Sequence, residues 1–310
     1  MSFVSSKDQL LGLNLWPTSH SEMITVRAGP NSLLSWEQFP RDLECMFNWA
    51  TIAKDVSCTD KSWENMIIYR NPPTPAPNAM YPISVCLYGC LQAFNVGKFG
   101  NWDGDPSTAT RATQSISLIS GGHDEAWQNQ LDNLNIASAF ASCMMKLPLH
   151  RPRFPSLLYF QWRVFRQADP DPCYGIQTIC AGSLCAHPTW EWNDALPILQ
   201  ITANHECIPL HEILLNRFDF VEVDAEFNLI VSRPKDGSPT LKIFLSFKHL
   251  VRLLDASASK VTGSKSQKRA RDPGDSMAST PTVKCLCAIT RARSLTFSNE
   301  ESAQQSTSAV

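Results

Sequence analysis

The sequence predicts an α+β fold, in which helices and mostly antiparallel strands form one globular body followed by a disordered basic tail. Three observations support this prediction. Apolar residues make up 43% of the 310 residues and charged residues only 18%, a composition that can build a core and excludes a wholly disordered chain. Segments with helical and with strand periodicity follow one another in no regular βαβ order. The charged residues are also divided unevenly along the chain.

This division of charge separates a body at residues 1–255 from a tail at residues 256–310. The tail holds eight basic and four acidic residues and so carries +4, whereas the body carries −6. Seventeen of the 55 tail residues are Ser or Thr, and such a segment buries too little apolar surface to offset the entropy of ordering it. We therefore expect a Ser/Thr-rich disordered tail after a single body, with candidate subdivisions near 71–77 or 148–155.

Helical spacing of apolar residues is clearest over residues 124–147. The apolar stripe comprises Trp127, Leu131, Leu134, Ala141 and Met145. Asp124 and Glu125 in the first turn complement the helix dipole, and Pro148 ends the helix. Similar spacing predicts further helices at residues 40–55, at residues 208–218 and directly after residue 246.

Strands are predicted where β-branched and aromatic residues cluster. The segments are 83–88, 115–119, 157–165, 220–224, 227–232 and 241–246. The short interval between the fourth and fifth segments predicts a hairpin. Alternation along that hairpin places Glu222, Asp224 and Glu226 on one face, which we expect to be an acidic, solvated face.

Cysteine and histidine are concentrated in residues 173–211, which hold seven of the 18 such residues in the chain. Thiolate and imidazole are the ligands that zinc prefers. Two ligand pairs could be drawn from five residues: one pair from Cys180, Cys185 and His187, and the other from His205 and Cys207. The spacing is loose and lacks a Cys-x2-Cys knuckle, so the alternative is that these cysteines are small buried residues and the histidines lie at the surface. The cofactor prediction is accordingly none, or zinc.

The order of residues from His205 through His211 to Asp219 is similar to the latter half of ββα-metal nucleases. In that family a histidine activates a water molecule beside a divalent metal. Here Leu215 stands four residues before Asp219, where the resemblance would require a histidine. The likeness covers a short part of the chain and lacks the reactive residue, so the family is not assigned. An amphipathic helix followed by a hairpin is the alternative interpretation.

A basic cluster in the tail predicts nuclear import. Its cations are Lys265, Lys268, Arg269 and Arg271. Clustered cations in a flexible segment fit the acidic groove of a nuclear import receptor, and they also attract phosphates. The alternative is a solvated basic tail without a receptor.

A second group of cations accompanies aromatic residues in the body and predicts a nucleic-acid or partner patch. Its members are Arg151, Arg153, Arg163, Arg166, Trp190 and Trp192. Paired aromatic rings can stack nucleobases or anchor a protein partner. The competing interpretation assigns the tryptophans to the core.

The leading hypothesis from the sequence is a non-enzymatic intracellular accessory protein, of viral or other host-interacting type, that enters the nucleus and binds protein or nucleic-acid partners. No phosphate-binding loop, dinucleotide fingerprint or nucleophile elbow occurs. No stretch reaches the ~20 apolar residues that span a bilayer, and the first residues do not resemble a secretory signal, which favours the nucleus and cytoplasm. The competing hypotheses are a metal-dependent nuclease or hydrolase centred on residues 173–219, and a self-assembling matrix-like or capsid-like protein.

Overall fold

The computed structural model describes residues 2–3, 10–28, 37–54, 65–72, 80–167, 190–193, 195–234 and 237–257. Within these residues the chain forms helices and one large, mostly antiparallel sheet, so the predicted α+β class is confirmed. Residues 258–310, which make up nearly all of the predicted tail, lie outside the described residues. No helix in the described part of the chain is both long enough and apolar enough to cross a membrane.

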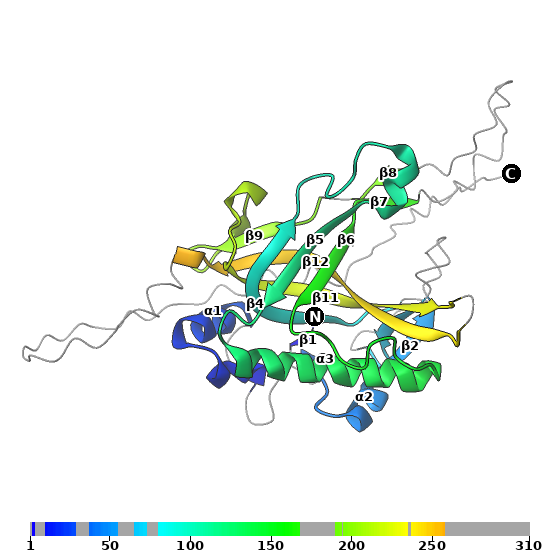
Figure 1. Ribbon diagram of the computed structural model, residues 1–310. Coiled ribbons are helices and arrows are strands. Elements are labelled where there is room, and N and C mark those ends of the chain that lie inside the picture. The colour runs from blue at the N-terminus through cyan, green and yellow to red at the C-terminus, as the bar shows by residue number, and fades with distance from the viewer. Residues whose placement is uncertain are drawn as a thin grey trace, which may run out of the picture.

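The order of elements mixes short helices with strands along the whole body (Figure 1). The helices are η1 (Leu10–Leu15), α1 (Thr18–Ala28), α2 (Leu43–Trp49), η3 (Pro106–Arg111), α3 (Asp124–Met145) and η4 (Glu212–Leu214), where η marks a 3-10 helix. The first strands are β1 (Ser2–Phe3), β2 (Ala50–Lys54), β3 (Asn65–Tyr69), β4 (Ser84–Asn95), β5 (Thr113–Ile119) and β6 (Leu158–Arg163). The remaining strands are β7 (Phe165–Gln167), β8 (Trp190–Trp192), β9 (Ile198–Ile201), β10 (Cys207–Pro209), β11 (Phe220–Ser232) and β12 (Thr240–Leu254).

Five strands of the sheet form a closed ring. Pairing runs from β12 through β6, β5 and β4 to β11, and β11 pairs with β12 in turn. β3 and β2 extend the sheet from β11, while β9 and β10 extend it from β12. β12 is parallel to β6 and β9, and β1 is parallel to β4, whereas the other pairs are antiparallel. β7 and β8 form a separate small sheet.

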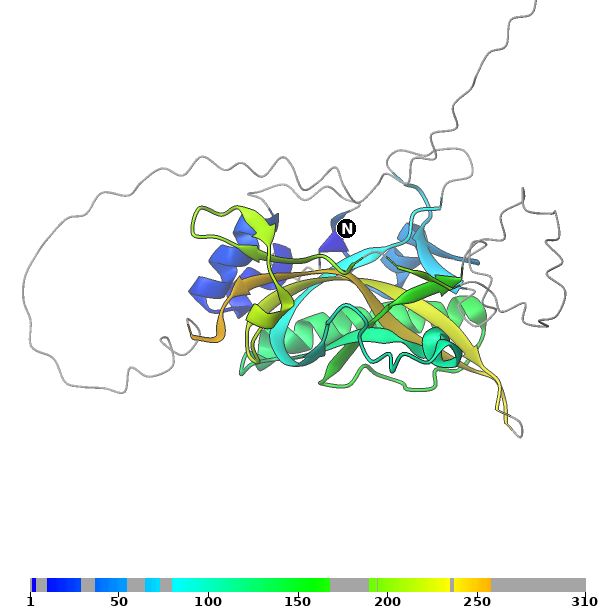
Figure 2. The same cartoon turned by 90° about the horizontal axis from the view of Figure 1, so that it is seen from above.

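The main core lies between the inner face of this ring and α3, which runs beneath the sheet in Figure 1. The helix predicted at 124–147 is confirmed: Trp127, Leu131 and Leu134 are buried against the strands. α3 ends at Lys146, whose left-handed backbone lets its N–H bond to carbonyls of the last turn. Figures 1 and 2 show α1 and α2 at opposite ends of α3, and α2 packs there through an edge-on contact of Phe47 with Phe140.

A side chain of α3 replaces a missing strand at one point of the ring. β4 pairs with β11 up to Cys90 and with β5 only from Cys90 onward. Tyr88 therefore has no β5 partner, and the buried Gln130 amide takes that place. Its Oε1 accepts from Tyr88 N–H at 2.8 Å and its Nε2 donates to Tyr88 C=O at 2.8 Å. The two bonds satisfy backbone groups that would otherwise be buried without partners.

The outer face of β4, β11 and β12 is also covered, because α1 packs on it. Ile24 and Ala28 of α1 join Trp16 in a second core cluster against Phe220 and Val251. β11 is therefore buried on both faces, and its acidic residues are no exception: Glu222 is 1% exposed and Asp224 is 2% exposed. The expectation of a solvated acidic face was wrong, because alternation predicts which residues share a face but not what covers it.

Two further predictions failed on β11 and β12. β11 is one continuous strand, and the hairpin lies between β11 and β12. The segment after residue 246 is not a helix but the second half of β12. The pairing register skips Lys248 and Leu253, and each skipped residue shifts the alternation by one. These bulges give the apolar residues of a strand the spacing of a helix.

Of the other two predicted helices, the one at 40–55 is shorter than expected and the one at 208–218 is absent. In 40–55 the helix stops at Trp49 and the chain continues as β2, which pairs with β3. In 208–218 the helix is absent, and its residues form β10 and the 3-10 turn η4. Both segments are short, and pairing with a neighbouring strand outweighed their helical pattern.

Candidate functional site

The loop between β4 and β5 is rigidly attached to the start of β5. Asn101 N–H donates to Thr113 C=O at 3.1 Å, and Asn101 Oδ1 accepts from Thr113 N–H at 2.7 Å. Gly100 has a φ of +56°, and a Cβ there would lie 2.2 Å from Thr113 O. Glycine is therefore required at this close approach. The attachment fixes the two aromatic residues on either side of it, Phe99 and Trp102.

Two carboxylates of the same loop are turned inward on its own backbone and hydroxyl groups. Asp103 Oδ1 accepts from Asp105 N–H at 3.0 Å and from the Thr108 hydroxyl, and the latter bond lowers the pKa of Asp103. Asp105 Oδ1 accepts from Ser107 N–H at 2.8 Å and caps η3. Trp102 Nε1–H donates to Asp105 C=O at 3.0 Å. The turn at Asp105 therefore fixes the orientation of the Trp102 indole ring.

The pair β7–β8 lies beside this loop, at the end of the sheet farthest from α3 in Figure 1. Phe165 of β7 is opposite Trp192 of β8 in the pairing register. Val164 N–H donates to Ala112 C=O at 3.1 Å, and Asn193 N–H donates to Val164 C=O at 2.8 Å. These bonds connect β8, β7 and the end of the loop.

Four aromatic rings and one ammonium group converge between the loop and β7–β8. Trp102 contacts Phe165 edge-on with ring centroids 4.8 Å apart, and Phe99 lies 5.7 Å from Trp102. Lys98 Nζ lies 4.7 Å from the Trp192 ring centroid and 5.3 Å from that of Phe99. Phe99 is 45% exposed and Trp192 is 44% exposed. We call these five residues, Lys98, Phe99, Trp102, Phe165 and Trp192, the aromatic–cation surface.

Further cations surround the aromatic–cation surface. Arg163 Nη1 donates to Thr110 C=O at 3.2 Å, and Asn193 Nδ2 donates to Arg163 C=O at 3.1 Å. Arg111 at the end of η3 is exposed. Cations around exposed rings are the combination that proteins use to hold a nucleic-acid backbone next to stacked bases.

The structure brings together one part of the patch predicted from the sequence. Trp192 belongs to the aromatic–cation surface, and Arg166 and Trp190 belong to the β7–β8 ladder beside it. Arg163 is connected to this ladder through its backbone carbonyl, which accepts from Asn193 Nδ2. Arg151 and Arg153 are exposed in the connection before β6, whereas Arg163 ends β6. The six residues of β6, a strand ~16 Å long, therefore lie between the two groups in the sequence.

The sequence analysis missed Lys98, Phe99, Trp102 and Phe165. The first three lie between the predicted strands 83–88 and 115–119, in a segment to which the sequence assigned no function. The signal that could have revealed them was the pair Phe99 and Trp102, because large aromatic residues are unusual in an exposed loop unless they bind something.

The predicted zinc ligands are only partly within the described residues. Cys180, Cys185 and His187 lie outside them. His205 is exposed in a turn with a φ of 63°, whereas Cys207 is partly buried beneath α1, where burial raises the pKa of its thiol. Among the described residues, no three His, Cys, Asp or Glu side chains are arranged to hold a metal ion. The import cluster of Lys265, Lys268, Arg269 and Arg271 also lies outside the described residues.

A second polar site is buried between α1 and the sheet. Arg27 Nη2 lies 2.7 Å from Glu222 Oε1, and His249 lies between two carboxylates, 3.9 Å from Glu222 and 3.7 Å from Asp224. We call Arg27, Glu222, Asp224 and His249 the buried charge cluster. Burial alone would raise the pKa of Glu222, but the adjacent Arg27 and His249 lower it to about 2.

The region between α1 and the sheet also concentrates unsatisfied polar atoms. Seven buried side-chain nitrogen and oxygen atoms have no hydrogen-bond partner within the described residues. Five of them lie between α1 and the sheet: His20 Nε2, Tyr88 Oη, Glu222 Oε2, Asp224 Oδ1 and His249 Nε2. Buried polar atoms without partners lower stability, and buried charges do so unless they are paired. The Arg27–Glu222 ion pair connects α1 with the sheet in this region, so it matters for holding α1 in place.

A ring cluster extends this interface toward the start of α3. His20 stacks beside Trp16, lies 4.2 Å from Phe220 and lies 4.9 Å from His123 between ring centroids. Burial, with a contribution from His123, lowers the pKa of His20 to about 4. The imidazole is therefore neutral at neutral pH.

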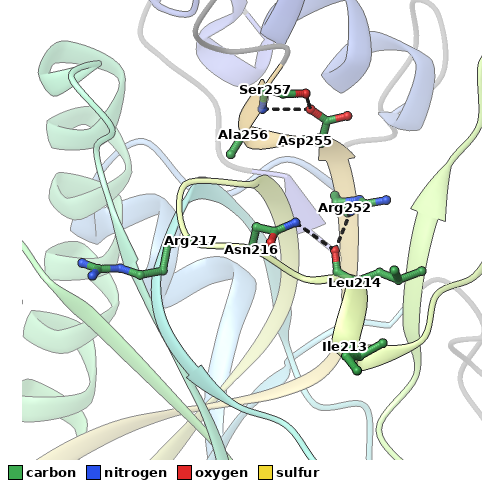
Figure 3. A pocket seen from close by; sticks show the side chains of 8 residues that line it. All are labelled: Ile213, Leu214, Asn216, Arg217, Arg252, Asp255, Ala256 and Ser257. Atoms are coloured by element: carbon green, nitrogen blue, oxygen red, sulfur yellow. Dashed lines mark hydrogen bonds between the residues drawn. The ribbon is translucent and has the colours of Figure 1, made fainter.

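A hollow at the end of β12 has a volume of about 790 Å³. Arg217 and Arg252 point in opposite directions there, as Figure 3 shows. Arg252 Nη1 donates to Leu214 C=O at 2.7 Å, and Asn216 Nδ2 donates to the same carbonyl at 3.2 Å. The hollow therefore presents no converging pair of cations, and the aromatic–cation surface is the better candidate for binding an anionic partner.

Comparison with protein-family models and with curated proteins found no match to this chain.

Proposed function

We propose that this protein is a non-enzymatic nuclear protein that binds nucleic acid through the aromatic–cation surface. The observation that supports the proposal best is the convergence of Phe99 and Trp192, both exposed, around the ammonium group of Lys98. Exposed rings beside cations suit a ligand that has both π-faces and negative charge. The acidic carboxylates nearby are engaged in turns of their own loop.

Entry into the nucleus is the second part of the proposal. It rests on Lys265, Lys268, Arg269 and Arg271, which we propose to bind a nuclear import receptor. A fluorescent reporter fused to residues 256–310 should accumulate in nuclei. Replacement of Lys268, Arg269 and Arg271 by Ala should make the reporter diffuse. A wild-type fusion that is diffuse from the start would contradict this part.

Nucleic-acid binding is tested with the purified full chain and fluorescein-labelled DNA in both single-stranded and duplex form. Fluorescence anisotropy should report binding that weakens as salt concentration rises, because cations release counterions when they bind phosphates. The double variant F99A/W192A should lose most of this binding. F218A is the matched control. Phe218 is also 45% exposed and lies beside a cation, Arg217, but it belongs to the connection between η4 and β11. Absence of binding at low salt to both forms would reject the proposal.

A further inference from the structure

The geometry of the aromatic–cation surface points to single-stranded nucleic acid as its ligand, with unpaired bases stacking on Phe99 and Trp192 and Lys98 moving from the rings to a phosphate. This inference rests on the proposed function and specifies its ligand. It is independent of the import signal, which lies in another part of the chain.

Each of the two exposed rings has an aromatic neighbour. Trp102 lies 5.7 Å from Phe99 between ring centroids, and Phe165 is the cross-strand neighbour of Trp192 in the β7–β8 pair. Trp102 and Phe165 are only partly exposed and contact each other edge-on, so they form the base on which the outer rings lie. Rigid rings with open faces stack bases at low entropic cost.

A duplex cannot use these rings in the same way. Its bases already stack on one another and expose only their edges in the grooves. A single strand exposes the π-faces of its bases, and stacking on aromatic side chains tolerates any base. In its described part the surface comprises a loop and a ribbon of two three-residue strands, with no α-helix that could lie in a groove.

Lys98 has a defined role in this model of binding. Its ammonium group lies over both exposed rings in the free protein, within cation–π distance of each. A base that stacks on Trp192 displaces the ammonium group from that ring. Lysine has a flexible stem, so the displaced charge can pair with the phosphate of the same nucleotide. The ring and the cation thereby contribute two separable interactions.

Charge complementarity supports a backbone contact at this place. Arg111 is exposed at the end of η3, and Arg163 is partly exposed at the end of β6. Asp103 and Asp105 accept hydrogen bonds from their own loop, which fixes the direction of their oxygens but leaves their charge, so Lys98 and the two arginines give three cations against two carboxylates. The interaction should therefore show a small but measurable salt dependence.

The experiment compares a short labelled oligothymidine with a duplex of mixed sequence, and it uses the full chain at several salt concentrations. We expect the single strand to bind at least about tenfold more tightly than the duplex. W192A should weaken single-strand binding by about 5-fold to 100-fold without changing the salt slope. W192F should restore much of the affinity, which would show that the loss comes from the ring and not from misfolding.

The Lys98 variant tests the second interaction. K98A should reduce the salt slope for the single strand by about 0.7, the value for one lost phosphate contact. Quenching of tryptophan fluorescence by the oligonucleotide should persist in K98A and decrease in W192A.

Three outcomes would count against the inference. Equal affinity for duplex and single strand, with W192A binding like the wild type, would reject stacking and leave the proposed nucleic-acid binding intact. An unchanged salt slope in K98A would reject the phosphate contact of Lys98. Absence of binding to either probe would reject both the inference and the proposed function.

Discussion

The buried charge cluster and the aromatic–cation surface reverse the usual distribution of residue types. Between α1 and the sheet, Glu222 and Asp224 are almost fully buried. At the opposite end of the sheet, Phe99 and Trp192 keep nearly half of their surface exposed. Burying charge is unfavourable unless it is paired, and exposing aromatic surface forgoes burial that would stabilise the fold. The buried charge cluster is therefore expected to affect stability, and the aromatic–cation surface is expected to affect binding.

The largest expected effect comes from breaking the buried ion pair. R27A should lower the free energy of unfolding by about 3–5 kcal/mol, because it leaves the Glu222 carboxylate buried without its partner. The double variant R27M/E222L should recover most of that loss, since apolar residues can replace a buried pair. Urea unfolding measures both.

The control for this prediction is the Lys248–Glu226 pair. Its atoms lie 2.6 Å apart, but the Lys248 side chain is 40% exposed. K248A should therefore change the free energy of unfolding by about 1 kcal/mol or less. If R27A and K248A were equally mild, the buried pair would not hold α1 in place.

The next effect is a loss of stability in acid, which depends on His20. Its pKa falls from 6.5 to about 4 on folding, so the unfolded chain binds the proton more tightly. Stability is therefore full above pH 6.5 and is lost as pH falls toward 4, by up to about 3 kcal/mol. H20F should reduce this loss, because phenylalanine keeps the ring contacts and cannot be protonated.

The measurement is thermal or urea unfolding between pH 6.5 and 4.5. Glu222 contributes little in this range, because its pKa falls from 4.5 to about 2 and its stabilisation is lost only below pH 4.5. His123 also has a pKa lowered by burial and accounts for a residual slope in H20F. Identical slopes for wild type and H20F would contradict the assignment.

The smallest expected effect on stability is at the aromatic–cation surface. F99A should change the free energy of unfolding by less than about 1 kcal/mol, because nearly half of the Phe99 side chain is already exposed in the folded protein. The same variant should weaken nucleic-acid binding several-fold. A large loss of stability in F99A would mean that the surface belongs to the core and would remove the contrast between the two sites.

How far the sequence predicts this structure depends on whether an element is determined locally. α3 was predicted because its apolar stripe, acidic first turn and terminal Pro148 agree with one another. β11 and β12 were predicted only in part, because the bulges at Lys248 and Leu253 depend on the partner strand. No local pattern reveals such a register shift.

The difference between local and long-range determinants also explains how much of the two sites could be predicted from the sequence. Burial of Glu222 follows from α1, which lies 195 residues away from it in the sequence. The aromatic–cation surface joins a loop after β4 to β8, so neither segment shows it alone. Of the patch predicted from the sequence, Arg166, Trp190 and Trp192 lie in this one small sheet.

Closure of the strand ring has a consequence for how the protein is made. β12 is the strand that joins β11 to β6, and it ends at Leu254. During synthesis β4, β5 and β6 leave the ribosome well before β12, so their pairing cannot be closed into a ring until β11 and β12 follow them. The ring cannot close until Leu254 has cleared the exit tunnel, which makes folding a late, non-local event and exposes the nascent chain to chaperones for most of its translation.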